Sequence, residues 1–459
     1  MPPANASLAD TAFAAPRKRF EALATVRQIL LMALPFMLGA IVTSALNLGK
    51  IAILAHAGNE QGLNTLSLLQ PAFIFVLAVM EGLAITNQVF SARSKNNWPR
   101  RGIAAASWRL SLIGIALLSA IALAAYGLGQ GRWLAQGTIG ETLQAMPLFV
   151  LSMAAFVVFD ICYAALRGQG KLARSLLPFI GLAVIDLSVT YTLSAHYGWG
   201  FEAVLVGNLA GPLAMLPITI WLLRREAGQG PAVPAPALRA RLGQLLLVVG
   251  LPLAASILAG AISAAVIFPA LADLGRDYAS GFMVVLRFRI AFMIPAIAFG
   301  SVIAILINQA EEEGTPEARL RYILFGVPLL LIGYGILAAT LPYYSRPVLD
   351  LLLSQRGDGE ALRGVTEEVL TQLQITFFLV AAAAMLQVIL EQLGRAPHVF
   401  VITIVTEALT CGATLYAIRQ GGDLNLVLLI LKAVAGLSFA ALLVQMLLLV
   451  IKMRRANAV

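Results

Sequence analysis

Apolar stretches long enough to cross a lipid bilayer recur along the whole chain, and they constrain its fold more than any other feature. A helix needs about 20 mostly apolar residues to span the hydrocarbon core of a membrane. Because 60% of the residues are hydrophobic and only 12% are charged, a soluble core could not bury them all. The sequence predicts an all-α integral membrane protein with about twelve spans: 28–57, 64–92, 104–128, 143–166, 174–196, 201–223, 242–271, 278–310, 322–342, 371–393, 398–418 and 425–451.

The distribution of positive charge predicts how these spans are oriented. An even number of spans puts both ends of the chain on one side of the membrane, and most of the 32 Lys and Arg residues lie in the loops on that side. By the positive-inside rule, that side is the cytoplasm. The net charge of +9 follows from this topology, so we predict no binding of nucleic acid. Short loops and Ala-, Leu- and Arg-rich usage suggest a bacterial plasma membrane.

A polar segment near the middle of the chain predicts two lobes of six spans each. Residues 224–241 are rich in Pro, Gly and Arg, as expected of a linker between helical bundles. The expected domains are a cytoplasmic N-terminal tail (1–26), an N-lobe (27–223), the cytoplasmic linker (224–241), a C-lobe (242–451) and a cytoplasmic C-terminal tail (452–459).

Matching features in the two halves indicate an internal repeat. The matched features, in chain order, are Ala33-Leu34-Pro35 with Gly250-Leu251-Pro252, Gly58 with Gly275, Asn87-Gln88 with Asn308-Gln309, and Asp186 with Glu407. A repeat of six plus six spans is a known transporter plan, with the substrate site between the halves near the middle of the membrane.

The residues of common enzyme sites are sparse. The chain has three His residues, two Cys residues and no Cys/His cluster that could bind zinc. No phosphate-binding glycine loop opens a helix after a strand, which argues against direct use of ATP. We therefore predict that the protein is not an enzyme and needs neither a metal nor a cofactor.

Charged residues inside the predicted spans are candidates for function, because a charge in hydrocarbon costs roughly 2.5–3.5 kcal/mol. Glu81, Asp186, Arg287 and Glu407 lie near the middle of their spans. Lys50 lies closer to the outer end, where a lysine side chain can also reach the membrane surface.

Two of these acids carry alternative interpretations. Asp186 and Thr190 are four residues apart and share a helix face, so together they could carry a proton or coordinate a cation. The alternative is a structural hydrogen bond within the N-lobe. The same two interpretations apply to Glu407.

The roles of the cationic candidates depend on which residues lie beside them, and the sequence alone does not show this. Lys50 could pair with Glu81 on the next span, and Asn47 could share its face as a polar contact to substrate. Arg287 and Arg289 lie on different faces of one helix, so at most one of them lines a central cavity. The alternative for Arg287 is an ion pair that holds helices together.

Several segments resemble the multidrug and toxic compound extrusion (MATE) family. These segments are Leu34-Pro35 with the run to His56-Ala57-Gly58, then Gln88 to Arg93, the turn Leu166 to Gly170, Gly250-Leu251-Pro252, and Ile307-Asn308-Gln309. The resemblance covers nearly the whole chain in order. It implies two six-helix lobes in a V shape and export driven by a proton or sodium gradient.

One position departs from that resemblance. The family commonly has an aspartate in the first helix, about eight residues before the glycine that matches Gly58, and here the residue is Lys50. A lysine has no acceptor with which to bind a sodium ion. The usual coupling site is therefore expected to be absent or moved.

We expect a secondary transporter that exports small organic molecules by alternating access, in antiport with protons or sodium ions. The cationic side chains favour an anionic or zwitterionic substrate. The alternative is a flippase for a lipid-linked anionic intermediate, since the superfamily includes such proteins. The expected partners are a small-molecule substrate and the lipid bilayer, and the protein is expected to work as a monomer.

Overall fold

The computed structural model describes residues 9–94, 101–130, 137–227, 233–274, 276–344, 347 and 359–457. Every regular element among them is a helix. The first half contains α1 (Ala9–His56), α2 (Glu60–Leu68), α3 (Gln70–Ala92), α4 (Arg101–Gly129), α5 (Gly137–Ser152), α6 (Ala154–Gly168), α7 (Leu172–Tyr197) and α8 (Phe201–Ala227). The second half contains α9 (Ala235–Leu245), η1 (Leu246–Gly250), α10 (Leu251–Leu274), α11 (Arg276–Glu312), α12 (Pro316–Ala339), α14 (Gly359–Leu390), η2 (Glu391–Arg395), α15 (Ala396–Arg419) and α16 (Leu424–Asn457).

The helices are long enough for a membrane protein with many spans. Ten stretches of the described chain are long and apolar enough to cross a bilayer, or eleven if α5 and α6, which meet at a bend of 43°, form one span. The longest stretch, Arg363–Arg419, has 57 residues. A straight helix of that length would measure about 85 Å, nearly three times the hydrocarbon thickness. It is instead interrupted in η2, where Gly394 has a φ of 81°.

The all-α membrane fold is thus confirmed, whereas the exact number of twelve spans stays a prediction. The helices do not follow all of the predicted boundaries. Helix α1 already begins at Ala9, so most of the predicted tail 1–26 is helical. The predicted linker 224–241 is helical at both ends, because it includes the last turn of α8 and the beginning of α9. The second predicted span, 64–92, is divided between α2 and α3.

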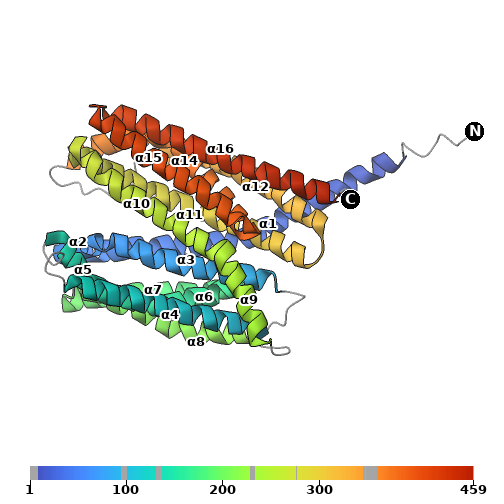
Figure 1. Cartoon of the computed structure of the whole chain (residues 1–459), viewed down its shortest axis with the longest axis horizontal. Coiled ribbons are helices and arrows are strands. Elements are labelled where there is room, and N and C mark those ends of the chain that lie inside the picture. The colour runs from blue at the N-terminus through green and yellow to red at the C-terminus, as the bar shows by residue number, and fades with distance from the viewer. Residues whose placement is uncertain are drawn as a thin grey trace, which may run out of the picture.

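The two halves of the chain form two groups of helices that lie side by side (Figure 1). Helices α3 to α8 form one group, and α10, α12, α14, α15 and α16 belong to the other. Helix α1 packs against α7 in its own half and also against α11 and α12. Helix α3 packs against α6 and also against α10. The first two long helices of the chain therefore make much of the contact between the halves.

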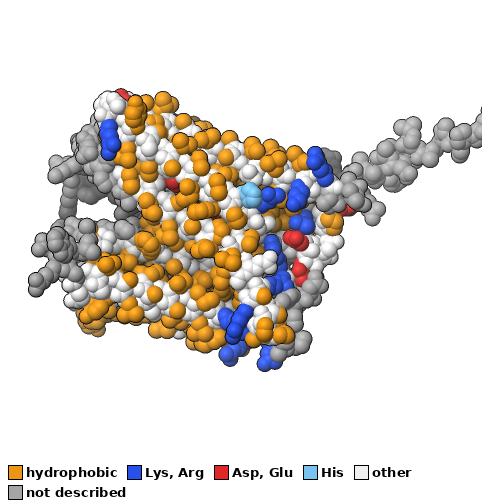
Figure 2. All heavy atoms as spheres, viewed as in Figure 1, with side chains coloured by type: hydrophobic (Ala, Val, Ile, Leu, Met, Phe, Trp, Pro, Cys, Tyr) orange, Lys and Arg blue, Asp and Glu red, His pale blue; other side chains and the backbone are white. Residues whose placement is uncertain are grey.

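The surface of the bundle is apolar around its middle (Figure 2). Large hydrophobic side chains such as Leu177, Leu123 and Ile262 are 75%, 71% and 64% exposed. In a membrane this apolar surface contacts lipid, so its exposure carries no penalty. Most visible Lys and Arg side chains gather at the end of the bundle near the C-terminus. We call this end, which includes Arg93 and Lys452, the basic end.

Candidate functional site

A buried ion pair joins α1 to α7 within the first half. The Nζ atom of Lys50 lies 2.8 Å from Oδ2 of Asp186. Lys50 is 8% exposed and Asp186 is 1% exposed. The predicted pairing of Lys50 with Glu81 is therefore wrong, because the packing of α1 on α7 gives Lys50 a carboxylate there. The alternative that Lys50 reaches the membrane surface is also wrong.

Neighbouring polar groups complete the coordination of this pair. The ammonium group of Lys50 also donates a hydrogen bond to Oδ1 of Asn208 on α8. Asn208 in turn donates through Nδ2 to the Oγ atom of Ser152, at 3.1 Å. The hydroxyl group of Thr190 donates to Oδ1 of Asp186 at 3.4 Å, as the spacing of four residues predicts. The pair is thus a hydrogen-bonded unit, which is how buried charges are stabilised.

Two glycines on α8 allow this unit to form. A Cβ atom at Gly207 would lie 2.2 Å from Oγ1 of Thr190 and 2.6 Å from Oδ1 of Asp186. A Cβ atom at Gly211 would lie 2.5 Å from the backbone oxygen of Leu182. Any larger residue would push α8 away from α7. These two glycines were not among the predicted site residues, although their spacing of four residues indicates a close helix contact.

Two predicted site residues are not placed by the structure. The side chains of Asn47 and Arg287 lie outside the described part of the chain. Arg289, the neighbour of Arg287 on α11, lies within electrostatic range of Glu407 on α15. Glu407 also approaches α10, because a Cβ atom at Gly260 would lie 3.9 Å from its Oε1 atom. Glu407 thus has a cationic neighbour within its own half, as Asp186 does.

At the basic end, hydrogen bonds connect the two halves directly. Gln392 in η2 is the common member: its Oε1 atom accepts from Nε2 of Gln88 at 2.9 Å. Its backbone oxygen accepts from Arg93 and from Asn308, both at 3.3 Å. Its Nε2 atom donates to Oγ of Ser301 at 3.1 Å. One buried glutamine therefore bonds to both halves at once.

Further contacts extend this connection. Nε of Arg93 donates to Oδ1 of Asn308 at 2.8 Å. Nε2 of Gln309 donates to the backbone oxygen of Gly168 at 2.9 Å. Burial lowers the pKa of Arg93 from its ordinary value, and the carboxylate of Glu311 opposes this effect. We call the bonds of Gln88, Arg93, Asn308, Gln309 and Gln392 the inter-half network.

These residues were not among the predicted site residues. Asn87-Gln88 and Asn308-Gln309 served only as matched features of the internal repeat. The available signal was that these amides fall within predicted spans near basic loops. An amide that is buried there must find a hydrogen-bond partner. Gln88 and Asn308 are both 0% exposed.

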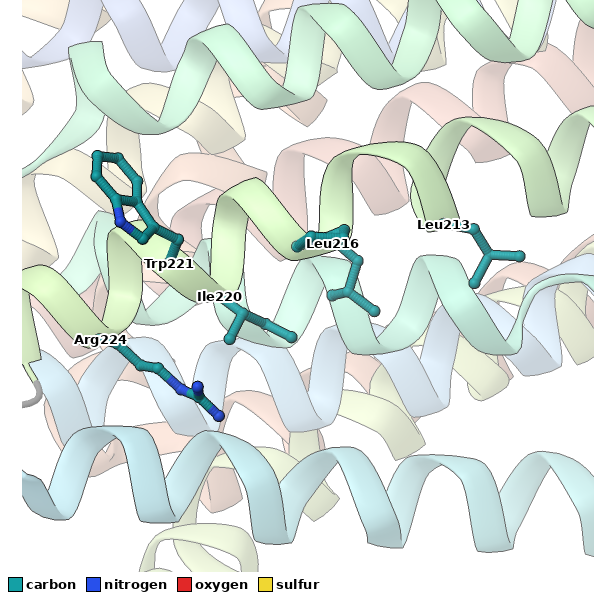
Figure 3. Close-up of a pocket in the computed structure, with 6 residues that line it drawn as sticks. Leu213, Leu216, Ile220, Trp221 and Arg224 are labelled. Atoms are coloured by element: carbon teal, nitrogen blue, oxygen red, sulfur yellow. The ribbon is translucent and has the colours of Figure 1, made fainter.

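A surface groove on α8 is a different kind of feature (Figure 3). Its volume is about 470 Å³, and it is lined by Leu213, Leu216, Pro217, Ile220, Trp221 and Arg224. All of these residues come from one helix, and Figure 3 shows the labelled side chains spread along it. Leu213 and Trp221 are each 55% exposed. We interpret the groove as part of the lipid-facing surface.

Solved structures with the same architecture identify the fold. A MOP superfamily transporter from Pyrococcus furiosus, described as having a binding pocket of reverse polarity that suggests a different function, superposes with a TM-score of 0.83. It is 15% identical, and the match covers 94% of this chain and 97% of that one. The chain has the MATE transporter fold.

Two other structures with the MATE fold agree with this assignment. One is an outward-facing multidrug resistance MATE transporter, and the other is a MATE transporter in the straight conformation. Each gives a TM-score of 0.82 at 16% identity and covers 94% of this chain and 97% of its own. No protein-family model and no curated protein sequence matches the chain. The likeness establishes the fold of a multi-pass membrane protein.

No metal site accompanies this fold in the described residues. Within the ranges given above, no three His, Cys, Asp or Glu side chains gather in a way that could hold a metal ion. The two cysteines, Cys162 on α6 and Cys411 on α15, are free.

Proposed function

We propose that the chain is a secondary active transporter that exports small organic molecules by alternating access, in exchange for protons or sodium ions. The two halves act as the two lobes of the transporter and rock against each other. The basic end faces the cytoplasm of a bacterium, in agreement with the positive-inside rule. The protein works as a monomer and needs no cofactor beyond its coupling ion.

The observation that carries this proposal is the inter-half network at the basic end. The network consists of hydrogen bonds between side chains and from side chains to backbone oxygens, which can break and re-form as the halves move. Closing the halves at one end of the bundle is half of an alternating-access cycle. With the basic end closed, the substrate site faces away from the cytoplasm, as in the outward-facing MATE transporter with the same fold.

The paired charges favour a zwitterionic or neutral substrate over an anionic one. The expectation of an anionic substrate rested on Lys50 and on one of Arg287 and Arg289. Lys50 is neutralised by Asp186, and Arg289 has Glu407 as a neighbour. Neither cation is therefore an open site for a negatively charged group.

The test compares metabolites inside and outside cells with and without the protein, in the presence and absence of an uncoupler. We expect a soluble metabolite to accumulate outside only when both the protein and the ion gradient are present. Accumulation that survives the uncoupler in sodium-free medium would contradict gradient-driven export. If instead no soluble metabolite changes and a lipid-linked precursor builds up without the protein, the flippase is the correct function.

A further inference from the structure

Three carboxyl groups from both halves, two of them buried and one partly buried, lie near the inter-half network. Glu391 in η2 is 1% exposed, and Asp160 on α6 is 8% exposed. Glu81 on α3 interacts electrostatically with both of them. None of the three takes part in the Lys50–Asp186 pair. We call Glu81, Asp160 and Glu391 the carboxyl cluster.

The packing of α3 on α6 fixes where two of these groups lie. Nδ2 of Asn87 donates to the backbone oxygen of Ile161 at 2.8 Å, and Oγ of Ser91 donates to that of Ala165 at 2.7 Å. Asp160 therefore lies next to the contact of Asn87 with α6. Glu81 lies six residues before Asn87, or about 9 Å deeper along the helix.

The third group comes from the other half of the chain. Glu391 directly precedes Gln392, whose side chain bonds to Gln88 on α3. Its Oε1 atom accepts a hydrogen bond from Nε2 of Gln387 at 2.9 Å. The carboxyl cluster thus spans the boundary between the halves, and Glu391 is its only member that moves with the second half.

Arg167 is the cation that faces the cluster. Its Nη2 atom is 3.9 Å from Oδ1 of Asp160, and its guanidinium lies over the rings of Phe36 and Tyr163, 5.3 Å and 4.8 Å from their centroids. Cys162 and Tyr163 on α6 are the other titratable groups near Asp160. One guanidinium cannot neutralise three carboxylates, so the fully ionised cluster carries net negative charge between the halves.

One oxygen of the cluster lacks a partner. Oδ2 of Asp160 is buried and accepts no hydrogen bond within the described part of the structure. A buried carboxylate oxygen without a donor is costly, and a second carboxylate nearby raises that cost. Binding of a proton removes one negative charge and supplies the missing hydrogen. The arrangement therefore fits a proton as ligand.

We propose that Glu81, Asp160 and Glu391 form a proton-binding site that links proton uptake to closure of the basic end. This proposal rests on the proposed transport function and names its coupling ion. When the basic end is closed, the three carboxyl groups share protons, and the inter-half network holds. When the halves separate, Glu391 leaves with the second half, and the protons are released on the cytoplasmic side.

The structure of η2 supports the link between the charge and the network. Glu391 and Gln392 are successive residues just before the kink at Gly394, where the chain passes from α14 to α15. Electrostatic repulsion that moves Glu391 therefore also moves Gln392. The backbone oxygen of Gln392 accepts hydrogen bonds from Arg93 and Asn308. Ionisation of the cluster and loss of the network are therefore coupled through one short segment.

The test measures the distance between the halves as a function of pH, without any substrate. The full chain, with Cys162→Ala and Cys411→Ala, carries spin labels at Leu177→Cys on α7 and His398→Cys on α15, both exposed positions near the basic end. A second pair, Tyr197→Cys and Gln420→Cys, reports on the opposite end. Distances are recorded in lipid nanodiscs from about pH 5 to about pH 9.

We expect the basic-end distance to lengthen and the opposite-end distance to shorten as pH rises. Glu391→Gln, which cannot ionise, shifts the midpoint of this response by about one pH unit or more or abolishes it. Asp160→Asn and Glu81→Gln shift it in the same direction and provide the test if Glu391→Gln does not fold. The matched control is Glu368→Gln. Glu368 lies on α14, the helix that precedes η2, but it is exposed at the opposite end of the bundle.

Distances that do not change with pH would overturn the proposal, as would a response in all three cluster variants equal to that of Glu368→Gln. The result is independent of transport. If export requires the proton gradient but the distances ignore pH, the cluster is not the proton site and the transport function stands. If the distances respond to pH but no export is found, the proton site stands and the transport function fails.

Discussion

At the scale of single residues, the Lys50–Asp186 pair shows how a buried charge is retained. Each charge alone would cost several kcal/mol in hydrocarbon. Together with Asn208 and Thr190, they form a hydrogen-bonded unit across α1, α7 and α8. Such a pair contributes little net stability, but losing one partner leaves the other charge buried and unpaired.

We expect Lys50→Ala to destabilise the protein by about 3–5 kcal/mol, because Asp186 then lacks its counter-ion. The double variant Lys50→Ala/Asp186→Ala should recover part of that loss. The measurement is the thermal unfolding midpoint of the purified protein in detergent, with Lys452→Ala at the exposed basic end as control. Equal midpoints for Lys50→Ala and the control would show that the pair is not formed.

Lys50→Asp should create a cation site where the native chain has an ion pair. Two carboxylates would then lie near Oδ1 of Asn208 and the hydroxyl group of Thr190, a set of oxygen ligands that suits a hard cation. We expect sodium, compared with choline, to raise the unfolding midpoint of Lys50→Asp but not that of the native protein. Sodium stabilisation of the native protein would mean that a cation site exists elsewhere.

The residues of this unit differ in how far the sequence could predict them. The contact of Asp186 with Thr190 followed from helix geometry, which fixes the spacing of four residues. The partner of Lys50 could not be predicted, because it depends on which helix packs beside α1 at that depth. Proximity in the chain favoured Glu81 on the next helix, whereas tertiary packing brings Asp186 from α7.

At the scale of elements, the close contact of α7 with α8 depends on two glycines, which have no side chain. Gly207 and Gly211 leave room on α8 for Asp186, Thr190 and the backbone of Leu182. Small residues at a helix interface allow close approach of backbones, which stabilises packing where no hydrophobic effect acts between helices.

Gly211→Ala should therefore destabilise the protein, because its Cβ atom would lie 2.5 Å from a backbone oxygen that cannot move independently. Gly412→Ala on α15 is the matched control, since no atom lies within 4 Å of its Cβ position. Alanine is favoured over glycine in a helix by about 1 kcal/mol, so the control should be neutral or more stable. Unfolding midpoints that fall equally in both variants would contradict the close contact.

Element boundaries were the least predictable part of the fold. Polar and proline-rich composition around Arg224 to Arg241 predicted a linker, yet α9 begins at Ala235. Proline is tolerated in the first turn of a helix, so Pro236 does not prevent α9 from starting there. The π-helical turn η1 left no signal in the pattern, because apolar periodicity does not register one extra residue in a turn. The kink at Gly394 in η2 left none either, because the pattern does not report a backbone angle.

At the scale of the whole molecule, the repeat and the apolar spans predicted the fold class, and the MATE fold is confirmed. The hydrogen bonds between the halves could not be predicted from the sequence. It depends on the relative position of two groups of helices, and the same polar residues would be solvated if the halves were apart. The inter-half network is thus a property of this conformation as much as of the chain.

Holding the inter-half network closed should stop transport. Gln88→Cys and Gln392→Cys, placed where an amide–amide hydrogen bond of 2.9 Å joins the halves, can be linked by a short reducible thiol crosslinker. In a background with Cys162→Ala and Cys411→Ala, we expect export to cease on crosslinking and to resume on reduction. Each single cysteine variant is the control. Undiminished export with the linker in place would exclude rocking at this end.

The Lys50–Asp186 pair also has a consequence for biosynthesis. Lys50 enters the membrane with α1, and 158 residues separate it from Asn208. At about 5–20 residues per second, Asn208 is synthesised roughly 8–30 seconds after Lys50. For most of that interval the ammonium group has neither its carboxylate nor its amide partner, because Asp186 is synthesised only 22 residues before Asn208. The first helix is therefore held in place by its apolar flanks, and the first half matures only after its eighth helix has left the ribosome.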